Sequence, residues 1–85
     1  MIWPVKDSLY SPEYKKVLVR LIELRAQAGL SQRDLAKKLK REHSFVWRIE
    51  TGRRRLDIVE FLWLCQTLGQ DAVAVYRKIV QDITR

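Results

Sequence analysis

Residues 31–55 read SQRDLAKKLKREHSFVWRIETGRRR and hold most of the positive charge of an 85-residue chain. Nine Lys and Arg residues stand against three Asp and Glu in this segment, a net charge of +6 where the whole chain carries +7. Residues 1–30 carry +2 and residues 56–85 carry −1. A run of basic charge is often only a solvated helix face, but its confinement to one segment of a nearly neutral scaffold favours a surface that binds a polyanion.

The basic segment is patterned as two short helices joined by a tight turn. Ser31 opens a capping-box pattern that starts the first helix, expected at about residues 32–39. Residues 40–42 interrupt the apolar spacing, and a second helix is expected at about 43–50. Such a pair predicts a helix-turn-helix over about 31–50, in which the first helix crosses the phosphate backbone of DNA and the second enters the major groove.

Three further helices are expected around this pair, which makes the chain an all-α, five-helix domain. They span about residues 12–28, about 56–68, and the C-terminal residues from Asp71 onward. Residues 1–11 are expected to form an N-terminal arm ahead of a single domain at 12–85, because a chain of this length supplies one hydrophobic core. On the last two helices the predicted core positions are Leu56, Val59, Leu62, Cys65, Leu68, Ala72, Val75, Tyr76, Ile79 and Ile83.

The composition excludes several classes of function. One Cys and one His rule out an internal disulfide and a structural zinc site, and no metal, cofactor or small-molecule substrate is expected. No apolar run is long enough for a membrane span or a signal peptide, so the expected compartment is the cytoplasm. Cys65 is expected to be buried rather than nucleophilic, and Glu50 to pair with an Arg rather than to catalyse. The chain is therefore not expected to be an enzyme.

Beyond this physical pattern, residues 29–39 and 44–55 closely resemble the Cro/CI-type (XRE) helix-turn-helix family of bacterial and phage transcriptional regulators. The segment that follows, residues 56–62, is similar to small stand-alone members of that family. The resemblance covers about residues 12–80, nearly the whole chain. It implies a lambda-repressor-like fold and a sequence-specific regulator, expected to be a repressor, that binds double-stranded DNA.

The resemblance also implies roles for individual side chains. It places base-reading side chains at His43, Ser44, Phe45, Trp47 and Arg48. It places phosphate-contacting side chains at Gln32, Arg33, Arg53, Arg54 and Arg55. The chemistry agrees, because Ser and His can hydrogen-bond base edges, Trp and Phe can contact thymine methyl groups, and Arg can neutralise phosphates. His43 could instead cap its helix or titrate as a pH switch. Lys40 stands at a turn position that family members usually give to Gly.

Surplus apolar residues suggest a second functional surface. Trp63, Val73 and Val80 lie off the main apolar stripes of their helices. An exposed patch of this kind favours a homodimer, which would place two recognition helices about one DNA turn apart on a palindromic operator. The sequence leaves open whether Trp3 in the arm folds onto the core or joins that interface.

Other classes of function remain as alternatives to a free-standing repressor. The chain could be the antitoxin of a toxin pair, with Trp63 and the C-terminal helix gripping a partner protein while the basic helix binds DNA. It could also be a controller of a restriction-modification or phage-lysogeny system. A membrane-surface protein is disfavoured, because the basic residues do not share one long amphipathic helix.

Overall fold

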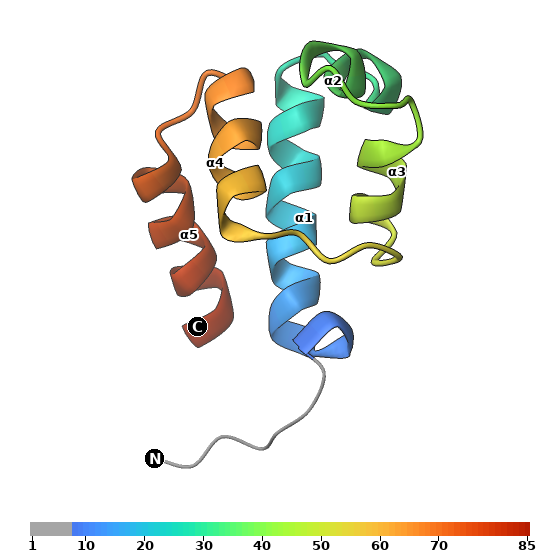
Figure 1. The fold of residues 1–85 in the computed structure, drawn as a ribbon. Coiled ribbons are helices and arrows are strands. Elements are labelled where there is room, and N and C mark those ends of the chain that lie inside the picture. The colour runs from blue at the N-terminus through green and yellow to red at the C-terminus, as the bar shows by residue number, and fades with distance from the viewer. Residues whose placement is uncertain (1–7) are drawn as a thin grey trace.

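Residues 8–85 are described by the computed structural model, and every regular element among them is a helix (Figure 1). A 3-10 turn, Ser8–Tyr10, precedes five α-helices, which are α1 (Pro12–Gln27), α2 (Gln32–Lys38), α3 (Phe45–Glu50), α4 (Ile58–Thr67) and α5 (Ala72–Thr84). The predicted all-α, five-helix fold is confirmed. Trp3 and most of the predicted arm lie outside the described residues.

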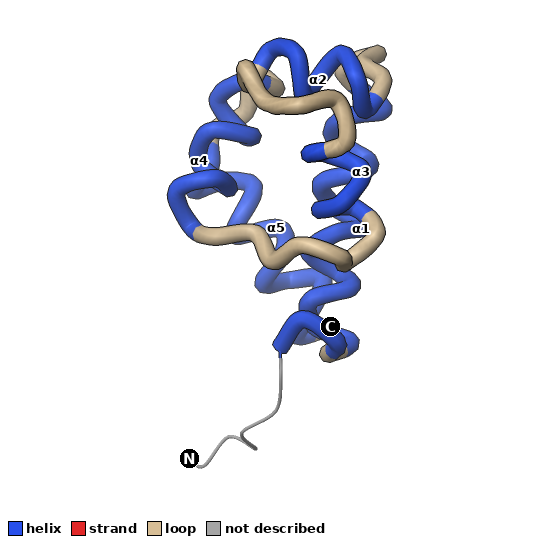
Figure 2. The backbone as a smooth tube through the Cα atoms, turned by 45° about the vertical axis from the view of Figure 1, so that its right-hand side comes forward, coloured by secondary structure: helices blue, strands red, loops and turns tan. Residues whose placement is uncertain are grey.

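Helix α1 runs through the middle of the molecule, with α2 and α3 on one side and α4 and α5 on the other (Figure 1). It packs against α3 and α5, while α2 packs against α3 and α4 packs against α5. The loops that flank α3, one from α2 and one to α4, lie at opposite ends of that helix (Figure 2). Helix α3 therefore sits at the edge of the molecule, with one face packed inward and the other turned away from the remaining described helices.

The core gathers apolar side chains from all five helices. On α4 it differs from the prediction, because Val59 and Leu62 are exposed while Phe61 and Leu64 are buried, and on α5 Tyr76 is exposed. Nearly every position of α4 is apolar, so spacing alone does not select its buried face, and that part of the prediction is wrong. The buried apolar residues are Leu18, Leu21, Leu24, Leu35, Ala36, Phe45, Val46, Ile49, Phe61, Leu64, Cys65, Leu68, Val75 and Ile79.

Side chains cap the starts of α1, α2, α4 and α5, and at α2 and α4 the cap is a reciprocal capping box. The Ser31 hydroxyl accepts a hydrogen bond from the Asp34 N–H at 3.0 Å, and the Asp34 carboxylate accepts one from the Ser31 N–H at 3.1 Å, which confirms the predicted capping box. A second capping box, between Asp57 and Glu60, starts α4 at Ile58, later than predicted.

Helices α1 to α4 end in the same kind of turn, in which two residues past the helix donate backbone hydrogen bonds into its last turn. The turn needs a left-handed residue, which is Gly after α1, α3 and α4. After α2 this residue is Lys40, with φ 57°. A left-handed residue with a side chain costs roughly 1–2 kcal/mol. The turn is held nonetheless, because the Lys40 and Arg41 N–H groups donate to the Lys37 and Ala36 carbonyls at 3.0 Å.

Candidate nucleic-acid interface

The outward face of α3 carries three of the predicted base readers. Val46 and Ile49 are buried, and their packing turns Trp47 outward, where it is 43% exposed. Ser44 precedes the helix in a helical conformation, and its side chain makes no capping hydrogen bond. His43, the residue before Ser44, is exposed. It lies outside the helix, since α3 begins at residue 45 rather than at residue 43 as predicted. The structure thus brings His43, Ser44 and Trp47 to the outer side and the N-terminal end of α3.

Phe45 and Arg48, predicted beside these residues, are placed differently. Phe45 is 3% exposed and belongs to the core, so the prediction that it contacts bases is wrong. The reason is the helical repeat: Phe45 lies one turn before Ile49, on the face that packs inward. Arg48 forms an ion pair with Glu42 of the turn, and its Nε is buried with no hydrogen-bond partner in the described part of the chain. Arg48 would have to leave Glu42 to reach a base.

Trp47 and Arg53 form one unit on the outward face. The guanidinium carbon of Arg53 lies 5.2 Å from the centre of the Trp47 ring, a cation–π distance. The Arg53 N–H donates to the Arg48 carbonyl at 2.9 Å and holds the loop against the end of α3. Thr51 is exposed nearby, and its hydroxyl donates to the Trp47 carbonyl at 2.8 Å. Sequence reasoning missed Thr51, although its spacing of four residues from Trp47 is the signal for a shared face.

Glu50, at the last position of α3, links three helices. Its carboxylate accepts hydrogen bonds from Arg25 Nε at 2.7 Å and Nη2 at 3.1 Å, and from Gln32 Nε2 at 2.7 Å. The predicted pairing of Glu50 with an Arg is confirmed. Gln32, predicted to contact a phosphate, has its amide group held in one orientation by this bond at the start of α2.

A second carboxylate, that of the buried Glu60, contacts two arginines. Arg54 donates to its two oxygens at 2.8 and 2.7 Å, and Arg41 Nη2 lies 3.7 Å from Oε2. Both guanidinium groups also lie over the Phe45 ring, 4.3 Å from its centre for Arg41 and 4.9 Å for Arg54. The hydrogen bonds from Arg54 hold the pKa of the Glu60 carboxyl below its ordinary value. Arg54, predicted to contact phosphate, is therefore engaged within the protein.

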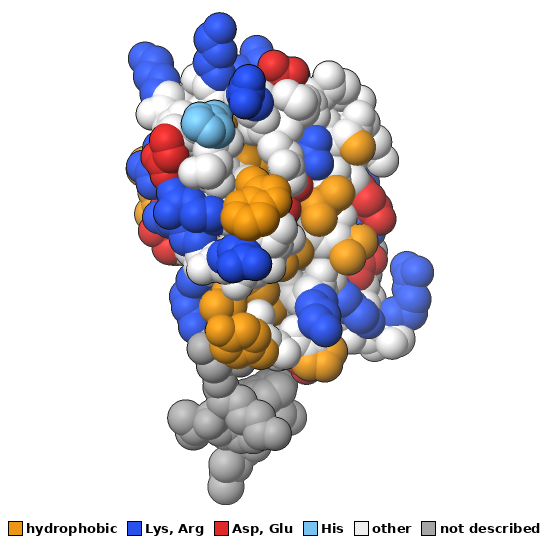
Figure 3. All heavy atoms as spheres, turned by 90° about the vertical axis from the view of Figure 1, so that its right-hand side faces the viewer, with side chains coloured by type: hydrophobic (Ala, Val, Ile, Leu, Met, Phe, Trp, Pro, Cys, Tyr) orange, Lys and Arg blue, Asp and Glu red, His pale blue; other side chains and the backbone are white. Residues whose placement is uncertain are grey.

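Positive charge gathers on the face that includes α3 (Figure 3). There, Lys and Arg side chains surround the exposed apolar side chains and lie near the histidine (Figure 3). The exposed basic residues of the segment 31–55 are Arg33, Lys37, Lys38, Lys40, Arg41, Arg53 and Arg55. Three of the predicted phosphate contacts, Arg33, Arg53 and Arg55, are among them. A polyanion that approached α3 would meet these charges at the same time.

Other kinds of site are not built by the described residues. Within 8–85, no three His, Cys, Asp or Glu side chains come together in a way that could hold a metal ion. Cys65 is fully buried, and burial raises the pKa of its thiol to about 11, which fits the predicted packing role. None of the helices in this range is both long enough and apolar enough to cross a membrane.

Comparison with known proteins decides the family. A family model described as a helix-turn-helix domain matches residues 18–75, from within α1 into α5. A solved XRE-family like protein from Pseudomonas syringae pv. tomato str. DC3000 is 39% identical, with a TM-score of 0.78, over 81% of this chain and 84% of that chain. The chain belongs to the XRE helix-turn-helix family. The resemblance read from the sequence is thereby confirmed.

A second solved structure similar to this XRE-family protein is that of a named regulator. A single-residue mutant of the restriction-modification controller protein C.Esp1396I is 25% identical, with a TM-score of 0.77, over 88% of this chain and 95% of that chain. No curated protein matches the sequence. As a member of the XRE family, the protein is a DNA-binding helix-turn-helix regulator, and the arrangement of α2 and α3 described above is its DNA-binding motif.

Proposed function

We propose that this XRE-family regulator represses transcription by binding a twofold-symmetric operator as a homodimer. The observation that carries the proposal is the outer side of α3, where the exposed Trp47 follows His43 and Ser44 at the helix start, on the face where Lys and Arg side chains gather (Figure 3). The major groove admits an α-helix and displays a distinct pattern of hydrogen-bonding groups and methyl groups for each base pair. A protein that occupies such an operator blocks the promoter that contains it.

The proposed roles follow from what each side chain contacts in the free protein. The base-reading side chains are His43, Ser44 and Trp47. The phosphate contacts are Gln32, Arg33, Arg53 and Arg55. Arg53 lies over the Trp47 ring, so the two side chains approach the DNA as one unit. Trp47 then contacts a base in the major groove, and Arg53 contacts a phosphate beside it. Arg54 adds positive charge from a fixed position, since its guanidinium is bound to Glu60.

An exposed apolar stripe on α5 supports the homodimer. Val73, Tyr76 and Val80 are 66%, 56% and 39% exposed and recur at helical spacing. Tyr76 meets the buried Phe61 of α4 edge to face, with ring centres 6.5 Å apart, so the stripe is held against the core. Trp63 instead lines the groove between α4 and the α2–α3 turn. We therefore keep Val73 and Val80 in the proposed interface and replace Trp63 with Tyr76.

Selection from a random library of duplexes tests this function. The full chain is expected to enrich a palindromic sequence with half-sites about 10 base pairs apart. In anisotropy titrations at physiological salt, it should prefer that duplex over a scrambled one by about a thousandfold or more. A reporter gene behind the selected sequence should be repressed when the protein is expressed. Equal binding to both duplexes would contradict the proposal.

Trp47→Ala tests the proposed base reading with a matched control. It should lower the preference by about 10-fold to 100-fold, because one specific contact contributes roughly 1–3 kcal/mol of discrimination. Leu62→Ala removes another large, half-exposed apolar side chain, this one on α4 and away from the groove that Trp63 lines, and should leave the preference unchanged. Titration of each variant against the selected and scrambled duplexes gives the comparison. An unchanged preference in Trp47→Ala would remove Trp47 from the base readers.

A restriction-modification controller is a second candidate, favoured by the similarity to C.Esp1396I over most of both chains. Such a controller would also bind DNA through α3, so the duplex selection does not separate the two candidates. The genes that flank the coding sequence do: a nuclease gene and a methyltransferase gene beside it would favour the controller.

A further inference from the structure

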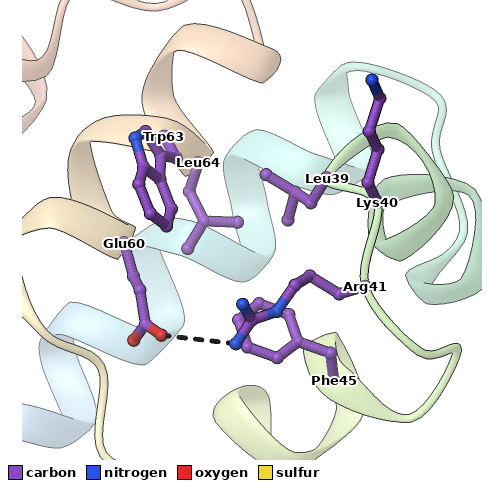
Figure 4. A pocket seen from close by; sticks show the side chains of 7 residues that line it. All are labelled: Leu39, Lys40, Arg41, Phe45, Glu60, Trp63 and Leu64. Carbon is purple, nitrogen blue, oxygen red and sulfur yellow. Dashed lines mark ion pairs between the residues drawn. The ribbon is translucent and has the colours of Figure 1, made fainter.

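One carboxylate contacts the two segments that flank α3. Arg41 lies in the turn before α3 and Arg54 in the loop after it, and both reach Glu60 in the first turn of α4. Figure 4 shows the ion pair between Arg41 and Glu60. Glu60 is 6% exposed and is the only charged residue in the described core. Its Oε1 also accepts a hydrogen bond from the Asp57 N–H at 3.1 Å, which fixes the carboxylate to the start of α4.

The same cluster reaches α3 itself through Phe45, the first residue of that helix. Its ring lies under both guanidinium groups and lines a groove of about 320 Å³ together with Leu39 and Trp63 (Figure 4). Helix α3 has only six residues, and a helix of that length is not stable by itself. Its orientation on the domain therefore depends on tertiary contacts, which are the core packing of Val46 and Ile49 and the side chains that hold its two ends.

We infer that Glu60 is a positioning residue for sequence recognition, holding α3 at one angle to α4 through Arg41, Arg54 and the Phe45 ring. The inference rests on the proposed sequence-specific DNA binding and goes beyond it, because it assigns specificity to a buried residue of α4 that reads no base. Base contacts require side chains to be held within a fraction of an ångström, so a small change in the angle of α3 would misplace His43 and Trp47 together.

The charge of Glu60 makes the inference distinguishable from a purely electrostatic effect. Glu60→Gln raises the net charge by one and releases two guanidinium groups, so electrostatics alone predicts tighter binding to every duplex. A positioning role predicts weaker binding to the selected operator alone. Positioning thus lowers the ratio of operator affinity to scrambled-duplex affinity, whereas a uniform gain of charge leaves this ratio unchanged.

The experiment measures this ratio by anisotropy for the wild type and for Glu60→Gln. Thermal unfolding first confirms that the variant is folded at the assay temperature. The ratio is expected to fall about tenfold or more, equivalent to the loss of one specific contact. Glu13→Gln is the matched control, since it makes the same charge change at an exposed position on α1, and it should leave the ratio unchanged. Arg54→Gln should lower the ratio as Glu60→Gln does, and the double variant should lower it no further.

The outcomes separate this inference from the proposed function. A folded Glu60→Gln variant that keeps the wild-type ratio overturns the inference and leaves the proposed function standing. Additive effects in the double variant also overturn it. A wild type that selects no sequence removes the proposed function and the inference together. If Glu60→Gln does not fold, Arg54→Lys replaces it, because Lys keeps the charge but cannot make the bidentate contact with Glu60. The inference then requires the same fall in the ratio for Arg54→Lys.

Discussion

Glu50, on α3, accepts hydrogen bonds from the side chains of two other helices, from Arg25 on α1 and from Gln32 on α2. Arg25 also donates to the Leu30 carbonyl at 2.8 Å, so the same pair holds the loop between these helices. In a chain with a net charge of +7, buried carboxylates of this kind offset part of the repulsion among the basic residues. A single carboxylate such as Glu50 therefore stabilises the contacts among several segments of the fold.

Glu50→Ala should lower the free energy of unfolding by about 3 kcal/mol, because it leaves the half-buried Arg25 guanidinium without its carboxylate. Urea denaturation measures the change. Glu23→Ala is the matched control: its ion pair with Arg20 is 3.4 Å long and exposed. An exposed pair contributes roughly 0–1 kcal/mol. Equal losses in the two variants would show that burial of the Glu50 pair does not matter.

The Glu60 carboxylate stabilises the folded protein at neutral pH, and this stabilisation decreases in acid. Its folded pKa lies below the ordinary value of 4.5, chiefly because Arg54 donates two hydrogen bonds to the ionised form. In the acidic range below about pH 4.5 the unfolded chain binds more protons at this position, so this stabilisation is present at neutral pH and is lost as the pH falls through the folded pKa.

The urea concentration at the midpoint of unfolding should therefore fall more between pH 7 and pH 3.5 for the wild type than for Glu60→Gln. The variant has no carboxyl to protonate at this position. Both proteins share the remaining carboxylates, such as Asp34, whose pKa is also lowered by hydrogen bonds from Ser31. Their common acid sensitivity therefore cancels in the comparison. Identical pH profiles would mean that the Glu60 carboxyl is not stabilised in the folded protein.

At the scale of whole helices, α2 and α3 begin in different ways. The Ser31 side chain caps α2, whereas the Ser44 side chain makes no capping hydrogen bond at the start of α3. The cap of α2 stabilises the first helix of the helix-turn-helix. The hydroxyl of Ser44, which we propose to contact a base edge, makes no such bond, and α3 therefore has a less stable start.

These two serines should respond to substitution in opposite ways. Ser31→Ala should lower the free energy of unfolding by about 1 kcal/mol, because the first turn of α2 loses its cap. Ser44→Ala should change it by only a few tenths of a kcal/mol, roughly the effect of a surface substitution, but should lower the preference for the operator. Denaturation and duplex titration of both variants provide the four values. A large loss of stability in Ser44→Ala would mark it as a structural residue.

At the scale of the whole molecule, the charged face and the apolar stripe of α5 lie on different elements. The charged face surrounds α3 (Figure 3). The apolar stripe belongs to α5, on the other side of α1 (Figure 1). A second copy can therefore pack on α5 without covering α3. In a symmetric dimer of this kind, each half-site is read by one α3.

Val73→Glu should convert the proposed dimer into a monomer, because it buries a carboxylate in an apolar interface. The helix should tolerate Glu there, since a carboxylate suits the first turn of α5. Sedimentation velocity gives the oligomeric state, and operator affinity should fall along with dimerisation. Val19→Glu makes the same change at an exposed Val on α1 and should leave the state unchanged. A wild type that sediments as a monomer at all concentrations would contradict the interface.

Much of the fold was predictable because helix boundaries depend on residues close together in the chain. The capping box of Ser31 with Asp34 and the left-handed turn at Lys40 each involve a few consecutive residues. The helix-turn-helix and its family resemblance rest on the same local pattern. The outward position of Trp47 also followed, because a helix turns its faces at a known period.

The sequence by itself determined the five helices, the helix-turn-helix and the concentration of basic charge around it. The tertiary structure alone decided that Arg54 is bound by Glu60 and which face of α4 packs inward. Burial and ion pairing depend on neighbours brought together by packing, such as Arg25 and Glu50, which are 25 positions apart. A local pattern specifies where a helix begins and ends, but only the assembled core specifies which of its side chains remain available to DNA.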